Sequence, residues 1–141
     1  MRFLAPLLFA LIGGCATIVV SLQLDERFGP ADPGRFDRPA VVSSGAPDYR
    51  KEVRPVLDQR CVSCHACYDA PCQLNLASYA GITRGASPKT VYSSIRLLAD
   101  EPTRLNFDAL TNRDWRAKGF FPVLNERAQV PEANREGGAM Y

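Results

Sequence analysis

Four of the five cysteines of this chain and its only histidine fall within the stretch CVSCHACYDAPC, from Cys61 to Cys72. Thiols and an imidazole at such short spacing are typical of a covalently attached cofactor, a metal site or disulfides. The chemistry of the chain is therefore concentrated in this stretch, and several kinds of centre compete for it.

The first interpretation is a covalently bound haem c. In the pattern C-x-x-C-H, two thiols form thioethers to the haem and the following histidine ligates its iron. Cys61, Cys64 and His65 have this spacing, and in a helix positions i, i+3 and i+4 share one face. We therefore predict one haem c bound by Cys61, Cys64 and His65, with His65 as the metal ligand; if the haem is catalytic, His65 is the expected catalytic residue.

Three other centres use the same residue types. An iron–sulfur cluster would need Cys61, Cys64, Cys67 and Cys72, but the gap before Cys72 is one residue too long for the bacterial ferredoxin pattern, and proline precedes this cysteine instead of following it. Structural zinc sites generally separate their two ligand pairs by a longer loop. The remaining alternative is two disulfides with a histidine that has no role.

Residues 1–24 are expected to form an export signal, or a membrane or lipid anchor. Arg2 is the only charge before the apolar run FLAPLLFALIGG, which continues as CATIVVSLQL. This run could cross a bilayer, but one proline and two glycines weaken a spanning helix, and the small residues GGCA suit peptidase cleavage. The sequence IGGC also resembles a lipoprotein box, which makes Cys15 a candidate lipidation site. Each outcome predicts a periplasmic protein, free or membrane-anchored.

Export changes how the cysteines are interpreted. An oxidising compartment favours disulfides, so a bond between Cys67 and Cys72 is expected beside the haem, with a redox-active thiol pair as the alternative. The leader lacks twin arginines, so the chain is expected to cross unfolded and to receive haem afterwards from the haem c maturation machinery. This route disfavours a cluster assembled in the cytoplasm, and the haem interpretation is preferred.

The sixth position of a haem iron has no obvious ligand in this sequence. His65 is the only histidine, and Met140 is the only methionine besides Met1. We predict an iron without a firm sixth ligand from this chain, or with one that missing sequence or a partner supplies. An open position suits a catalytic haem better than an electron carrier.

The remaining sequence predicts a small, mainly α, cytochrome-c-like domain with short helices and long loops. Residues 25–47 are rich in proline and glycine and are expected to be a linker, with an ordered arm over the core as the alternative; residues 48–141 form the haem-binding domain. The sequence predicts helices over Pro55–His65, Ser87–Asp100 and Thr111–Gly119, and a short extended or turn segment containing Leu74, Leu76 and Tyr79.

Two features frame these elements. In the helix over 111–119, Thr111 and Asp114 have capping-box spacing and Trp115 is the expected core anchor. The tail VPEANREGGAMY opens like a helix at Pro131 but ends early, so either it frays or the chain is incomplete at its C-terminus.

With 141 residues and a net charge of +2, the chain suits one domain and gives no reason to expect nucleic acid as a partner.

Several blocks of the chain resemble a known family. VRPVLDQRCVSCHACYDAPCQLNL, RGAS, RLLADEPTRLNFDA and WRAKGFFPVLNERAQ are similar to the N-terminal region of the bacterial fatty acid cis/trans isomerases, from about Tyr49 to the last residue. Members of this family are several times longer, so the resemblance implies a fragment. It also implies a periplasmic haem enzyme that converts cis double bonds in membrane phospholipid acyl chains to trans, at the inner or outer membrane surface, as a stress response.

Two further classes stay open beside the isomerase. An electron-transfer c-type cytochrome domain would need a stable sixth ligand, and a binding module stapled by zinc or disulfides would show no chromophore. If the chain meets lipid, its basic residues could contact phosphates, although a solvated charged face is as good an interpretation. These residues are Arg84, Lys89, Arg96, Arg104, Arg113, Arg116 and Lys118. Phe120 and Phe121 could enter a membrane surface but more often belong to a core.

Overall fold

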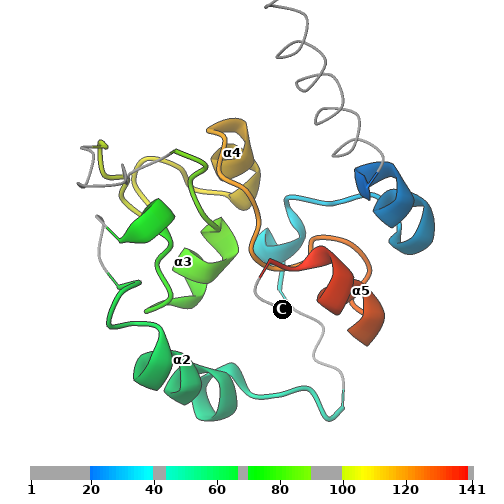
Figure 1. Ribbon diagram of the computed structural model, residues 1–141, viewed down its shortest axis with the longest axis horizontal. Helices are drawn as coiled ribbons and strands as arrows, with labels where there is room; N and C mark the ends of the chain where they lie inside the picture. The colour runs from blue at the N-terminus through cyan, green and yellow to red at the C-terminus, as the bar shows by residue number, and fades with distance from the viewer. Residues whose placement is uncertain (1–19, 40–43, 67–69, 90–99, 140–141) are drawn as a thin grey trace, which may run out of the picture.

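Short helices separated by long irregular segments make up the computed structural model of the chain, which describes residues 20–39, 44–66, 70–89 and 100–139 (Figure 1). Within these ranges there is no β-strand, and two isolated bridges pair Ala86 with Phe121 and Leu105 with Ala109. The helices are residues 20–28, η1 Arg35–Asp37, η2 Tyr49–Val53, α2 Arg54–Arg60, η3 Pro71–Gln73, α3 Tyr79–Arg84, α4 Asn112–Ala117 and α5 Pro131–Gly137. The mainly α prediction is confirmed, whereas the cytochrome-c-like arrangement stays a prediction.

Two expectations lie outside the described ranges. The leader is described only from Val20 onward, and the predicted helix over 87–100 only at its two ends. Among the helices that the structure does describe, none is long and apolar enough to cross a bilayer.

The helix before the histidine is shorter than predicted. It was expected over Pro55–His65, but α2 ends at Arg60, with Pro55 in its first turn as expected. The reason lies in the hydrogen bonds at its end: Val62 N donates to Leu57 O, five residues back, so the chain leaves the α-helical spacing of four.

Helix α3 was missed in the sequence, which was read as an extended or turn segment reaching Tyr79. Ser78 caps this helix, its hydroxyl accepting from Gly81 N at 3.1 Å, and Gly85 ends it with φ +82°. Both glycines are required by close packing, since a Cβ at Gly81 would lie 2.1 Å from Asn75 O and one at Gly85 would lie 2.0 Å from Phe121 O. A side chain at either position would force these segments apart.

Helix α4 forms as predicted. The Thr111 hydroxyl accepts from Asp114 N, and the Asp114 carboxylate accepts from Thr111 N, each at 3.1 Å, which completes the capping box. Trp115 is 3 % exposed and packs edge-on against Phe120, with ring centroids 5.0 Å apart. The prediction of Trp115 as a core anchor is confirmed.

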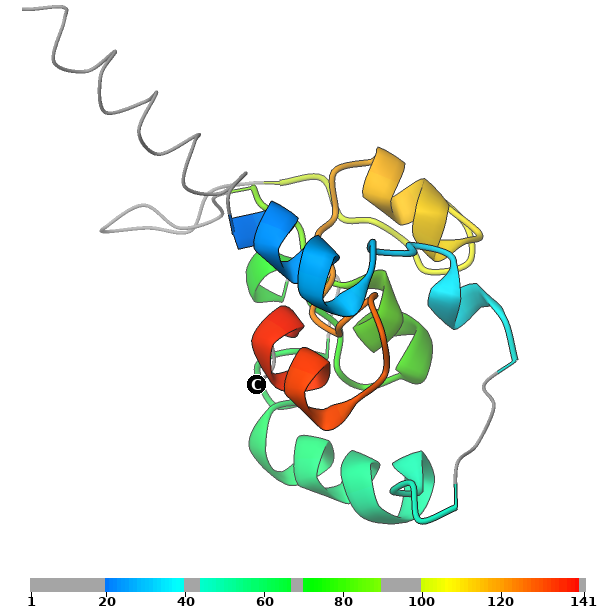
Figure 2. The ribbon, with the colours of Figure 1, turned by 90° about the vertical axis from the view of Figure 1, so that its right-hand side faces the viewer.

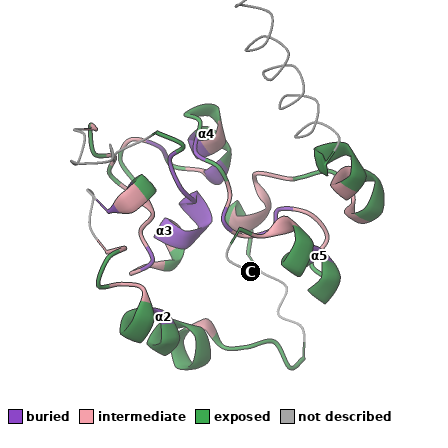
Figure 3. Cartoon of the chain, in the orientation of Figure 1, coloured by how far each residue is buried: buried purple, intermediate pink, exposed green. Residues whose placement is uncertain are grey.

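The buried residues gather in two clusters around α3, where Figure 3 shows most of the buried colour. The smaller cluster contains Trp115, Phe120 and Ala109. The larger cluster supports the end of α2 and the cysteine stretch. It contains Leu57, Leu76, Ile82, Ala86 and Val123, with Tyr49, Cys61, Val62, Leu74 and Leu124 packed against it.

The segment before residue 39 is an arm that lies on the C-terminal segment, rather than a free linker. Asp32 N donates to Glu126 O at 3.0 Å, Ala128 N donates to Phe28 O at 3.2 Å, and Arg127 pairs with Asp25 at 2.6 Å. Figures 1 and 2 both place the helix over 20–28 beside α5. Over residues 25–39 this is the arrangement of the ordered-arm alternative.

Helix α5 is anchored in the molecule, so fraying is the wrong description of residues 131–137. Ala133 is fully buried, and the Asn125 side-chain amide donates to Asn134 Oδ1 at 3.0 Å. Arg27 of the arm pairs with Glu136 at 2.7 Å. A helix this short is held by such tertiary contacts rather than by its own hydrogen bonds.

Candidate functional site

The two cysteines and the histidine of the C-x-x-C-H motif lie on one turn that follows α2. Cys64 N and His65 N both donate to Cys61 O, at 3.1 and 3.0 Å. This turn, residues 61–65, keeps the three residues together although the helix itself has ended at Arg60. The prediction that these three residues share a helix face is therefore wrong, because they lie on a turn after the helix has ended.

The two thiols of the Cys61–His65 turn differ in exposure. Cys61 is half-buried and packs against the larger core cluster, whereas Cys64 is exposed. Both thiols are free. The turn is thus fixed to the core at its first cysteine and presents its second cysteine to solvent, where a large reaction partner can approach.

His65 has a buried nitrogen that no group in the described part of the chain satisfies. Its Nδ1 atom makes no hydrogen bond, although the residue is only half-buried. A buried polar atom left without a partner costs about 1–3 kcal/mol. Such atoms in a native site call for an explanation, of which an unbound cofactor or ion is one.

Of the two cysteines expected to form a disulfide, Cys67 and Cys72, the structure describes only Cys72. Cys72 is an exposed, free thiol, and its expected partner, Cys67, lies outside the described residues. Among the residues that are described, no three histidine, cysteine or acidic side chains are arranged to hold a metal ion. Cys15 and Met140 also lie outside the described ranges.

The backbone after the cysteine stretch is held in an uncommon conformation. Cys72 and Gln73 have φ values of +55° and +50°, in the left-handed region. For residues other than glycine, this conformation costs roughly 1–2 kcal/mol each and persists where surrounding contacts impose it. Two such contacts are Ser87 N, which donates to Cys72 O at 2.7 Å, and Leu76 N, which donates to His65 O at 2.7 Å.

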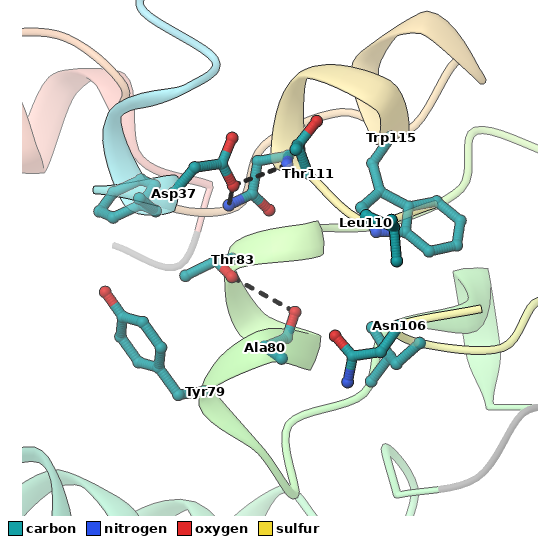
Figure 4. Close-up of a pocket in the computed structure, with 11 residues that line it drawn as sticks. Asp37, Tyr79, Ala80, Thr83, Asn106, Leu110, Thr111 and Trp115 are labelled. Carbon is teal, nitrogen blue, oxygen red and sulfur yellow. Dashed lines mark hydrogen bonds between the residues drawn. The ribbon is translucent and has the colours of Figure 1, made fainter. Parts of the chain in front are cut away.

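A pocket of about 310 Å³ lies elsewhere, between the arm, α3 and α4. Figure 4 shows Tyr79, Thr83 and Ala80 of α3 on one side and Leu110, Asn106 and Trp115 on the other. The residues that line it do not include the Cys61–His65 turn. Tyr79, which lines the pocket, packs edge-on against Tyr49, with ring centroids 5.5 Å apart, and Tyr49 packs against the same core cluster as Cys61.

The basic residues that were candidates for lipid phosphates fall into different environments. Arg84 is 2 % exposed, and Arg116 pairs with the buried Glu126 at 2.8 Å, so neither faces solvent. Lys89 and Arg104 pair with acidic neighbours, and Arg96 lies outside the described residues. For Arg84 and Arg116 the headgroup interpretation is wrong, because both guanidinium groups are used inside the fold.

Asp100 connects this charged surface to the interior. The Lys89 ammonium hydrogen-bonds Asp100 at 2.8 Å, and the Gln73 amide donates to the same carboxylate at 2.6 Å. These contacts, of which the hydrogen bond with Lys89 has the largest effect, hold the pKa of Asp100 below its ordinary value of 3.8. Asp100 is therefore a carboxylate at neutral pH and accepts hydrogen bonds from both sides.

Sequence reasoning missed two residues near the site, Gln73 and Arg84. Both are almost fully buried, and they hydrogen-bond each other and Thr103. Nothing in the sequence marked Gln73. Arg84 was noted as one of several surface cations, because a long-range contact decides its burial.

Comparison with known proteins gives one match. Residues 100–141 match the family model of the fatty acid cis/trans isomerases (CTI). Comparisons with curated proteins and with solved structures gave no match. The matched segment includes α4, Phe120 and α5, and through Thr103 and Asp100 it contacts Gln73 beside the cysteine stretch. Over residues 100–141 the chain is therefore similar to the fatty acid cis/trans isomerases, the family that its sequence motifs also resemble.

Proposed function

We propose that this chain contains the haem-binding region of a periplasmic enzyme that converts cis double bonds in phospholipid acyl chains to trans. One observation carries the proposal: the Cys61–His65 turn has two free thiols and an unsatisfied imidazole nitrogen, and Gln73, just after the cysteine stretch, hydrogen-bonds a segment that matches this isomerase family. The turn supplies the residues that could hold a cofactor, and the family match of residues 100–141 indicates the type of reaction.

The donor set of the turn fits one covalent haem c. Cys61 and Cys64 would form the two thioethers and His65 would ligate the iron. Free thiols are required for attachment, and both are present. The buried Nδ1 of His65 has no hydrogen-bond partner in the described part of the chain, so this ring nitrogen is not committed to another contact in the fold.

A bound ferric haem would supply an electrophile that draws electron density from a C=C bond and so lowers the barrier to rotation about it. His65, as the iron ligand, would tune the electronic properties of this electrophile. The cis substrate and the trans product are isomers, so atoms and electrons balance without a reductant or a cosubstrate. His65 is the only histidine in the sequence, so the sequence contains no second histidine that could also ligate the iron.

The place of the reaction follows from the leader and the substrate. An exported chain, anchored or free, meets acyl chains at the surface of the inner or outer membrane. Haem c attachment would follow export, through the periplasmic maturation machinery. The exposed thiol of Cys64 is accessible to such an attachment step in the folded arrangement.

The proposal is tested with the full-length chain, exported in a host that attaches haem c and added to vesicles of cis-unsaturated phospholipid. Gas chromatography of the acyl chains should show trans product with the original protein and none with the Cys61→Ser, Cys64→Ser double variant. The Cys72→Ser variant is the matched control, since it removes a free thiol outside the motif, and it should retain activity. Equal activity in the double variant, or reductant consumed in step with trans product, would contradict the proposal.

A further inference from the structure

We infer that Gln73 is the positioning residue of the Cys61–His65 turn. Its buried amide fixes the segment after the cysteines to residues 100–103, and this segment in turn holds the histidine. The inference builds on the proposed function, because it concerns how the histidine is placed for its cofactor. It nevertheless has a readout that does not need the cofactor.

The side-chain amide of Gln73 uses both of its ends. Its Nε2 donates to Asp100 Oδ2 at 2.6 Å and to Glu101 O at 3.0 Å. Its Oε1 accepts from Thr103 N at 3.1 Å and from Thr103 Oγ1 at 2.6 Å. Four directional contacts with one short segment allow a single orientation of the amide, which is 4 % exposed.

The backbone of Gln73 is fixed as well. Its carbonyl oxygen accepts from Arg84 Nη2, and Arg84 Nη1 donates to Thr103 Oγ1 at 3.2 Å. The Arg84 guanidinium also lies over the Trp115 ring, 5.4 Å from its centroid, and over the Phe120 ring, at 5.1 Å. Arg84 therefore ties both Gln73 and Thr103 to the smaller core cluster.

Two short backbone links connect Gln73 to the chemical residues. On one side, Gln73 N donates to the carbonyl oxygen of Ala70, within the cysteine stretch, at 2.7 Å. On the other side, three residues further along, Leu76 N donates to His65 O at 2.7 Å. A displacement of Gln73 would move Leu76 and, through this bond, the main chain of His65.

The amide side chain at position 73 is itself a sign that Gln73 holds the following segment in place. A buried apolar residue could fill the same space, but apolar contacts are not directional and would allow residues 72–76 to slide. Cys72 and Gln73 also lie in the left-handed region, so they need outside contacts to stay there. Gln73 provides these contacts from its side chain and its backbone together.

The test uses the full-length chain with Gln73→Met, which keeps the length of the side chain and removes its hydrogen bonds. Gln129→Met is the matched control, because the Gln129 amide donates two hydrogen bonds, to Asn125 O and Arg127 O, away from the turn. Thr103→Val is a milder second variant that preserves shape and removes one bond to the amide. His65 is the only histidine, so its ring gives an unambiguous nuclear magnetic resonance signal in the haem-free protein.

Gln73→Met should shift and broaden the His65 ring signal and change the midpoint potential of the haem-loaded protein. Thr103→Val should act in the same direction with a smaller shift, and Gln129→Met should leave both quantities unchanged. Isomerase activity should fall roughly tenfold in Gln73→Met, the lower end of what supporting residues around a metal ligand usually contribute.

The outcomes separate positioning from simple stability. If Gln73→Met or Thr103→Val unfolds cooperatively like the original chain but leaves the His65 signal unchanged, the inference is overturned. If Gln73→Met does not fold, Thr103→Val decides by the same criterion. If the original chain binds no haem, the proposed function fails, while the His65 signal of the haem-free variants still decides whether Gln73 positions the turn.

Discussion

The cysteine stretch and the segment from residue 100 onward use their side chains in opposite ways. In the stretch, the thiols of Cys61, Cys64 and Cys72 are free and His65 Nδ1 lacks a partner. In the segment, polar side chains are paired, as Arg116 is with Glu126. The first region keeps reactive groups available, and the second supplies the fixed contacts. Stability and chemistry are thus separated along the chain, and changes in each region should affect different measurements.

The largest effect is expected from substitutions in the cysteine stretch. The Cys61→Ser, Cys64→Ser double variant should lose covalent haem completely, because both thioether positions are gone. The measurement is the mass of the denatured protein after export, which should lack the mass of one haem. Cys72→Ser should retain the haem. A haem mass that persists in the double variant and disappears in Cys72→Ser would reverse the assignment.

Two adjacent phenylalanines of the matched segment differ in burial and therefore test which residues form its core. Phe120 is 6 % exposed and Phe121 is 41 % exposed. Phe120→Ala should lower the free energy of unfolding by about 3–5 kcal/mol, since it opens a cavity beside Trp115. Phe121→Ala should lower it by less than about 1 kcal/mol. Urea unfolding followed by Trp115 fluorescence measures both, and equal losses would contradict the assigned core.

A buried and an exposed ion pair make a second matched test. Glu126 is 3 % exposed and pairs with Arg116, whereas Glu136 and its partner Arg27 are both exposed. Glu126→Gln should lower the free energy of unfolding by about 3 kcal/mol, because it leaves a largely buried guanidinium uncompensated. Glu136→Gln should lower it by about 1 kcal/mol or less. If denaturation curves of the two variants coincide, the network around Glu126 is not structural.

The smallest expected effect is that of acid on the carboxylates. The hydrogen bond with Lys89 is the largest cause that lowers the pKa of Asp100, and the hydrogen bond with Thr111 is the largest for Asp114. Both carboxyl groups therefore have a pKa below the ordinary value of 3.8. A pKa lowered by folding contributes stability that is full above 3.8 and is lost as the pH falls through the folded-state value. The melting temperature should therefore be flat at neutral pH and fall in acid. Asp114→Asn should flatten part of that fall, and an unchanged acid profile would contradict the capping role.

What the sequence predicted well was local. The capping box of α4, the anchor Trp115 and the start of α5 at Pro131 depend on residues a few positions apart. Cys61, Cys64 and His65 are also close together in the sequence. Although α2 ends at Arg60, the turn over residues 61–65 keeps their backbones together.

What the sequence did not predict depends on contacts between distant segments. Gln73 meets residues 100–103 and Arg84 meets Trp115, and no local pattern signals either contact. The arm over residues 25–39 reads as a linker from its prolines and glycines, but its hydrogen bonds go to residues near 126. Helix α3 is the exception, since Ser78 and Gly85 mark its ends in the sequence.

The most direct test of the central claim is an optical spectrum of the protein exported with haem c attachment, recorded in the ferrous state before and after addition of carbon monoxide. The account predicts a haem c spectrum that shifts on addition of carbon monoxide, because in the proposed site His65 would ligate the iron and the sequence contains no second histidine. A haem spectrum that does not shift would favour an electron-transfer cytochrome. Absence of haem would contradict the role assigned to Cys61, Cys64 and His65.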